Sequence, residues 1–82
     1  MSEAVAGKRM RSVLLELEKE RAFQDRKWGE KNHQDLFWNA ILGEEVGEVS
    51  RSIIENGKVS EKELVQVAAV AVAWIECCRR NV

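Results

Sequence analysis

Apolar side chains recur every three or four residues along most of this chain, and that spacing predicts α-helices. The pattern favours three of them, at about residues 8–26, 36–56 and 60–80 of a single domain covering 1–82. The first carries an apolar stripe of Met10, Val13, Leu14 and Leu17 opposite a charged face. Since three helices account for almost the whole chain, we expect an all-α fold.

The second predicted helix places a carboxylate at the margin of its apolar stripe. At 100° per residue the stripe consists of Trp38, Leu42, Val46, Val49 and Ile53. Glu45 falls on the edge of this stripe, and Glu48 lies further round the helix. A carboxylate beside apolar packing needs a hydrogen-bond donor or a metal ion. We expect Asp35 to cap this helix and Gly57 to end it.

The third predicted helix is apolar on every side. From Leu64 to Ile75, eleven of twelve residues are apolar, and Gln66 is the exception. A helix with this pattern is normally buried all round, yet two other helices cannot enclose it. A second copy of the chain would cover it most simply, so we expect a homodimer or homotetramer in which helices of several copies form a bundle.

Composition and charge narrow the class of protein. The chain is 45% hydrophobic and 33% charged with no proline, which is typical of a helical protein. Its 13 basic and 14 acidic residues give a net charge of −1, and they form no basic block that would suggest nucleic acid or a membrane surface. Cys77 and Cys78 are adjacent, so we expect reduced thiols. With an N-terminus too polar for a secretory signal, we expect a cytoplasmic protein.

Three carboxylates lie within five residues of the second helix. Glu44, Glu45 and Glu48 lie in its middle, where like charges three or four residues apart repel by about 0.2–0.5 kcal/mol per pair. Glu63 and Gln66 offer a second polar pair at helical spacing on the next helix. Gathered carboxylates suit a hard divalent cation such as Mg²⁺, which is usually held together with substrate phosphates. One histidine and two adjacent cysteines are too few for zinc.

Several candidate residues could instead have a purely structural role, and the sequence leaves both interpretations open. Glu63 matches a capping box with Ser60, in which its side chain would bond the Ser60 N–H. Gln66 suits a hydrogen bond between helices, and Trp38 suits the core. Trp28 falls in a predicted loop, residues 27–35, where it is either a lid over a nucleobase or an anchor for the loop. His33, in the same loop, fits a hydrogen-bonding role better than catalysis.

The acidic residues resemble a family motif. Glu44-Glu45-Val46-Gly47-Glu48, followed on the next helix by Glu63-Leu64-Val65-Gln66, resembles the EExxE and ExxD motifs of the MazG-like, all-α NTP pyrophosphatases. The segment Arg26-Lys27-Trp28-Gly29 with His33 is similar to small phage- and cassette-type members. The resemblance covers about residues 10–80.

The resemblance implies Mg²⁺-dependent hydrolysis of a nucleoside triphosphate between its α- and β-phosphates, giving a monophosphate and pyrophosphate. By position, the catalytic residues would be Glu44, Glu45 and Glu48. The metal ligands would be Glu45, Glu48 and Glu63, with Gln66 replacing the family's fourth acidic ligand.

The remaining candidates would bind the substrate. Trp28, Lys27, Lys31, Trp38 and Arg51 are the residues expected to stack on a base or neutralise phosphates. The alternative is a non-catalytic helical oligomer, or a nucleotide- or protein-binding module with a degenerate site.

Overall fold

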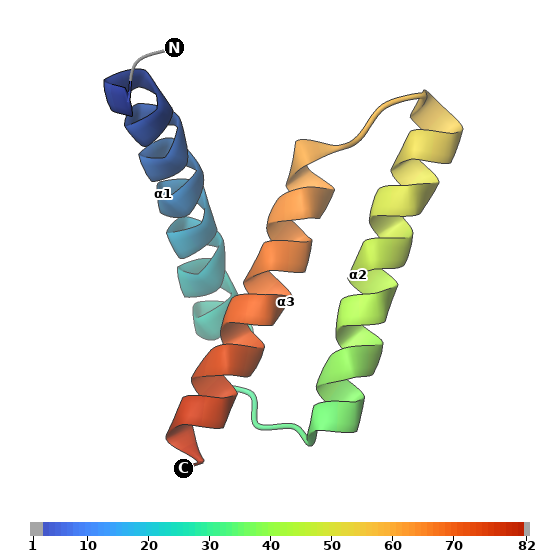
Figure 1. Cartoon of the computed structure of the whole chain (residues 1–82). Helices are drawn as coiled ribbons and strands as arrows, with labels where there is room; N and C mark the ends of the chain where they lie inside the picture. The colour runs from blue at the N-terminus through green and yellow to red at the C-terminus, as the bar shows by residue number, and fades with distance from the viewer. Residues whose placement is uncertain (1–2, 82) are drawn as a thin grey trace.

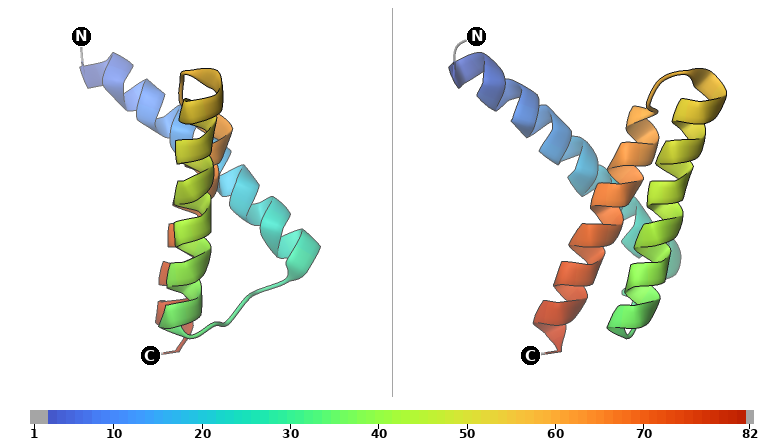
Figure 2. Two further views of the ribbon diagram at one scale, coloured as in Figure 1. Left: turned by 90° about the vertical axis from the view of Figure 1, so that its right-hand side faces the viewer. Right: turned by 45° about the vertical axis from the view of Figure 1, so that its right-hand side comes forward.

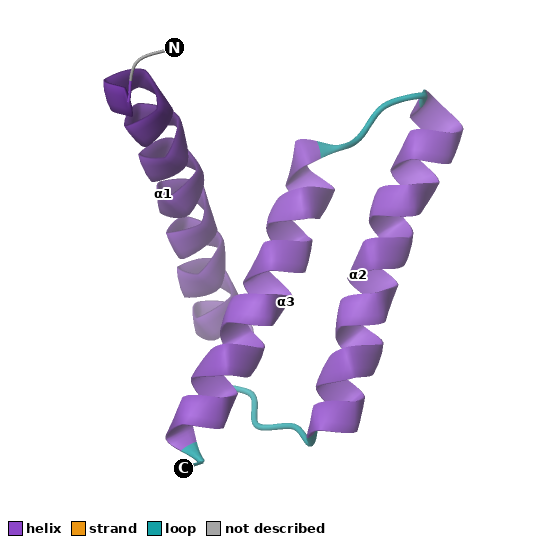
Figure 3. Cartoon of the chain, in the orientation of Figure 1, coloured by secondary structure: helices purple, strands orange, loops and turns teal. Residues whose placement is uncertain are grey.

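The computed structural model describes residues 3–81, with side chains from residue 7 onward, so residues 1, 2 and 82 of the predicted domain lie outside it. Within that range the chain has three α-helices and no strand (Figure 3). The helices are α1 (Glu3–Trp28), α2 (Asp35–Asn56) and α3 (Glu61–Arg80). The all-α prediction is confirmed. However, Lys27 and Trp28 belong to the last turn of α1, not to the predicted loop.

The third helix lies at the centre of the arrangement. α2 and α3 form an antiparallel hairpin, and α1 crosses behind α3 at a steep angle (Figures 1 and 2). Both α1 and α2 pack against α3. The N-terminal half of α1 extends away from the hairpin (Figure 1). None of the described helices is long and apolar enough to cross a membrane.

The hydrophobic core joins α2 to α3. Trp38, Val70 and Cys77 are buried at its centre, and Ile41, Leu42, Ala73 and Trp74 pack around them. Ala69, on the same helix as Val70, is fully buried. No described residue of α1 belongs to this core, and the contacts of α1 with α3 include the ion pair between Arg21 and Glu76.

The connection between α2 and α3 follows its predicted chemistry. Gly57 adopts a left-handed φ of 75° and donates its N–H to the Ile53 carbonyl at 2.8 Å, which ends α2. Ser60 caps α3 by accepting the Glu63 N–H at 3.4 Å. The Ser60 N–H donates to Ser52 Oγ at 3.4 Å, so the Glu63 side chain does not complete a capping box.

The start of α2 differs from the prediction. Gln34 occupies the N-cap position without a side-chain hydrogen bond, and Asp35 is the first helical residue. The expected Asp35 cap is therefore wrong. The physical reason is a competing donor, because the Trp74 indole N–H donates to Asp35 Oδ1 at 2.9 Å. Asp35 thereby links the first turn of α2 to α3.

Residues 29–34, between α1 and α2, are bound to the C-terminal end of α3. Asn32 Oδ1 accepts hydrogen bonds from Arg80 Nε at 3.2 Å and from the Cys77 thiol at 3.7 Å. Arg80 also donates to the Lys31 carbonyl at 2.9 Å. Both cysteines are free, and Cys77 is buried while Cys78 is exposed. These bonds fix the loop that carries Lys31 and His33.

Large apolar side chains remain exposed on the single chain. Met10, Val13 and Leu14 are each more than half exposed on α1, and Leu64 and Ile75 of α3 are 45% and 51% exposed. Of the α3 segment 64–75 that was expected to need cover, Leu64 and Ile75 are thus exposed in one copy, and the other residues are partly or fully buried. Enclosure of this segment by a second copy stays a prediction.

Candidate functional site

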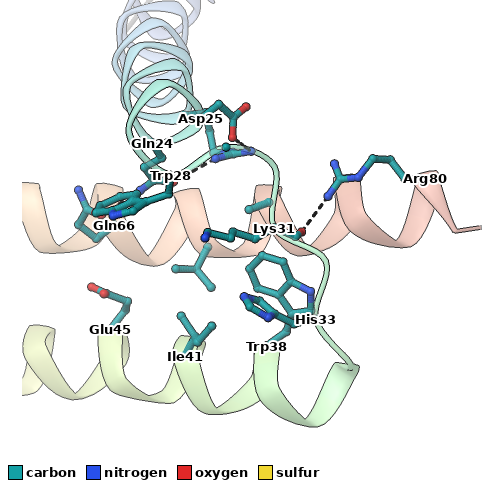
Figure 4. Close-up of a pocket in the computed structure, with 14 residues that line it drawn as sticks. Gln24, Asp25, Trp28, Lys31, His33, Trp38, Ile41, Glu45, Gln66 and Arg80 are labelled. Carbon is teal, nitrogen blue, oxygen red and sulfur yellow. Dashed lines mark hydrogen bonds and ion pairs between the residues drawn. The ribbon is translucent and has the colours of Figure 1, made fainter.

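A pocket of about 360 Å³ lies where the C-terminal end of α1 meets the α2–α3 hairpin (Figure 4). All three helices and the loop at residues 29–34 contribute to its walls. Of the candidate residues, it is lined by Trp28, Lys31, Trp38, Glu45 and Gln66. The fold therefore brings candidates from four separate segments to one cavity.

Glu45 is the acidic residue of the motif that lines this pocket. Its side chain extends from α2 into the space facing α3 (Figure 4). Burial raises the pKa of Glu45, and the negative charges of Glu63, Glu48 and Glu44 raise it further. Glu63 of α3 and Glu48 and Glu44 of α2 thus act electrostatically on Glu45. Within the described residues none of these four carboxylates is bound to a buried cation.

The other carboxylates have different surroundings. Glu48 pairs with the exposed Arg51 at 3.5 Å, a contact within one helix that contributes little in water. Glu44 is exposed. The Glu63 carboxylate is not used in capping and has no hydrogen bond or ion pair within residues 7–81. Glu63 is therefore free to act together with the acidic residues of α2.

These residues fit a magnesium ion in donor type and charge. All four offer carboxylate oxygens, the ligands that Mg²⁺ prefers. A cation would offset both the burial and the neighbouring negative charges that raise the Glu45 pKa. In the described part of this single chain, no three His, Cys, Asp or Glu side chains converge into a group that could hold a metal. Because Mg²⁺ keeps several of its waters, it requires only one or two direct carboxylate ligands.

Gln66 makes a hydrogen bond between helices, as one interpretation of the sequence expected. Its Oε1 accepts from Gln24 Nε2 of α1 at 3.2 Å. Gln24 belongs to a polar group on α1 in which Arg21 contacts Glu76 of α3 at 2.8 Å and Asp25 at 3.1 Å. Burial alone would lower the pKa of Arg21, but the bonds and charges of Glu76 and Asp25 outweigh it and raise that pKa.

The sequence analysis missed this contribution of α1. Arg21, Gln24 and Asp25 all line the pocket, yet none of them was among the candidate residues predicted from the sequence. The signal was present in the sequence, since these residues and Glu20 form one polar group at helical spacing. Nothing in that spacing indicates which helix such a group will contact.

The two aromatic candidates differ in position, because Trp38 lies in the wall of the pocket and Trp28 lies at its rim. Trp38 is 4% exposed and belongs to the core, with the His33 ring 4.9 Å from its own. The Trp38 indole N–H is buried and has no acceptor with good hydrogen-bond geometry. It nevertheless lies close enough to Cys77 to be the main cause that lowers the pKa of the Cys77 thiol. Trp28 is 53% exposed at the rim, and the Lys27 ammonium lies 4.8 Å from its ring centre. Trp28 is thus the ring with a surface open to a ligand.

The basic candidates are distributed unequally. The Lys31 side chain reaches into the pocket (Figure 4), and its ammonium has no ion pair within residues 7–81. Lys27 and Arg51 do not line the pocket, because Lys27 covers Trp28 and Arg51 contacts Glu48. Arg80, which the prediction omitted, lines the pocket beside the loop.

Comparison of the chain with protein-family models, curated proteins and solved structures finds no match. The resemblance to MazG-like pyrophosphatases therefore rests on the motif residues alone and stays a prediction.

Proposed function

We propose that the chain is a Mg²⁺-dependent nucleoside triphosphate pyrophosphohydrolase of the MazG-like type. One observation carries the proposal: Glu45 lies at the wall of a pocket that also has aromatic and basic walls, and burial together with the charges of Glu63, Glu48 and Glu44 raises its pKa. Negative charge at one end suits a metal ion, and Lys31 with Trp28 suits a phosphorylated ligand that carries a ring.

Among Glu45, Glu48 and Glu63, one or two carboxylates would bind the metal directly and the others would bind it through its waters. Glu44 would act beside them as a further ligand or as the base. When bound, Mg²⁺ supplies positive charge that neutralises phosphate oxygens. Lys31 contacts the phosphates, and Trp28 offers its exposed face to the base. A carboxylate outside the ligand set accepts a proton from the attacking water.

A second candidate function has its own support. Within the described residues the acids of one chain do not converge into a metal-binding group, and glutamine replaces an acid at position 66. Both observations suit a helical module that binds nucleotide or protein without catalysis. Its assembly into a homodimer or homotetramer is part of either proposal, and light scattering of the pure protein tests that assembly.

The deciding experiment follows pyrophosphate release. The full chain is incubated with a panel of NTPs and dNTPs, canonical and modified, with Mg²⁺ and with EDTA. We expect release only with Mg²⁺, and we expect Glu48→Gln to reduce it by about 100-fold or more while circular dichroism stays unchanged. Glu55→Gln, an exposed glutamate on the same helix, is the matched control. Turnover in EDTA, or wild-type turnover in Glu48→Gln, contradicts the proposal, and no release from any nucleotide favours the binding module.

A further inference from the structure

Hydrogen bonds to two charged residues fix the amide orientation of Gln24. Arg21 Nη1 donates to Gln24 Oε1 at 3.1 Å, and Gln24 Nε2 donates to Glu20 Oε2 at 3.0 Å. A guanidinium can only donate and a carboxylate can only accept, so the reversed amide would place donor against donor and acceptor against acceptor. Gln24 must therefore present an N–H to its third neighbour, which is Gln66.

The orientation of Gln24 determines which end of the Gln66 amide has no hydrogen-bond partner. Gln66 Oε1 accepts the Gln24 N–H at 3.2 Å, and the Gln66 amide N–H₂ has no partner within residues 7–81. Gln66 also borders a second hollow lined by Glu16, Lys19, Glu20 and Lys62, and within residues 7–81 its amide makes no hydrogen bond to these carboxylates. Because Gln66 lines the first pocket as well, a phosphate bound there is an available acceptor for the free N–H₂.

From this network we infer that Gln66 donates its amide N–H to a phosphate oxygen of the bound nucleotide and is not a metal ligand. The inference rests on the proposed function. An amide nitrogen does not bind Mg²⁺, which takes oxygen ligands, whereas an N–H complements an anionic oxygen. Gln66 follows Glu63 by three residues and shares its face of α3, so the donor lies beside the acidic cluster, where metal-bound phosphate would be.

Binding measurements test this without turnover. Gln66→Met keeps the length of the side chain and removes the donor. Gln34→Met is the control, because Gln34 is exposed and its side chain makes no capping bond. The probes are Mn²⁺ alone, and inorganic tripolyphosphate or an α,β-methylene NTP with Mg²⁺. For Gln66→Met we expect unchanged Mn²⁺ affinity and about tenfold weaker binding of both phosphate probes, the loss that one charge-assisted hydrogen bond represents.

The outcomes separate this inference from the proposed function. Weaker Mn²⁺ binding in Gln66→Met would make the Gln66 oxygen a ligand and overturn the inference, and so would unchanged tripolyphosphate binding. Weaker binding of the nucleotide alone would assign the amide to the base and also overturn it. If the expected pattern appears but the wild type releases no pyrophosphate from any nucleotide, the inference stands and the catalytic proposal fails.

Discussion

Replacing Glu45 with glutamine should stabilise the metal-free protein at neutral pH. Burial and three neighbouring carboxylates raise the pKa of Glu45 in the folded chain. A carboxyl group with a higher pKa in the folded than in the unfolded state adds stability at low pH, and that stability is lost as the pH rises through the raised pKa. At pH 7 the ionised Glu45 therefore opposes folding. Glutamine has the same shape and no charge.

The charge of Glu48 alone sets a lower bound on the size of the effect. Glu48 lies three residues away on α2, and like charges at that spacing repel by about 0.2–0.5 kcal/mol. Burial of Glu45, which is the largest cause of its raised pKa, and the charges of Glu63 and Glu44 add to this free energy opposing folding. For a domain of this size each kcal/mol shifts Tm by about 4–8 °C. The higher Tm of Glu45→Gln should therefore be measurable by thermal denaturation.

The assay is thermal unfolding followed by circular dichroism in EDTA at low ionic strength. Glu18→Gln, at an exposed position in the middle of α1, is the matched control. The stabilisation in Glu45→Gln should disappear at about pH 4, where the wild-type carboxyl is protonated. Added Mg²⁺ should raise the Tm of the wild type more than that of the variant. An unchanged or lowered Tm for Glu45→Gln at pH 7 in EDTA would refute the electrostatic reasoning.

Other substitutions test the packing of the helices. Arg21→Met should lower the free energy of unfolding by about 1–3 kcal/mol, because the 13%-exposed guanidinium joins α1 to Glu76, and urea denaturation beside the exposed Arg26→Met control checks this. A loss no larger than the control's would show that this ion pair does not hold α1. Gly57→Ala should destabilise by about 1–2 kcal/mol because φ is 75° there. Gly47→Ala, inside α2 with nothing within 4 Å of the added Cβ, should stabilise by about 0.5–1 kcal/mol, and a loss there instead would indicate a neighbouring copy.

Local chemistry made the helices and the end of α2 predictable. Hydrogen bonds within a helix join residues four apart, so the spacing of apolar residues suffices to locate α2 and α3. Gly57 acts on its nearest neighbours and was identified correctly, whereas only the Ser60 half of the capping-box pattern is present. The mutual influence of Glu45 and Glu63 could also be anticipated, because the short connection between α2 and α3 makes these helices antiparallel neighbours.

Contacts between distant segments could not be anticipated in the same way. The crossing of α1 over α3 depends on pairs such as Arg21 and Glu76, which are 55 residues apart in the chain. Asp35 looked like a cap because Trp74, its actual partner, lies 39 residues away. Helical periodicity describes the face of each helix and contains no information on which other helix meets that face.

The central position of α3 has a consequence for biosynthesis. A ribosome releases α1 and α2 first, and neither has its packing surface until the last of the three helices emerges. A short isolated helix is marginal in water, so the nascent chain should remain largely unstructured until then. Folding of these three helices is therefore expected only after α3 has been synthesised, and an arrested nascent chain lacking residues 61–80 should be readily cut by protease.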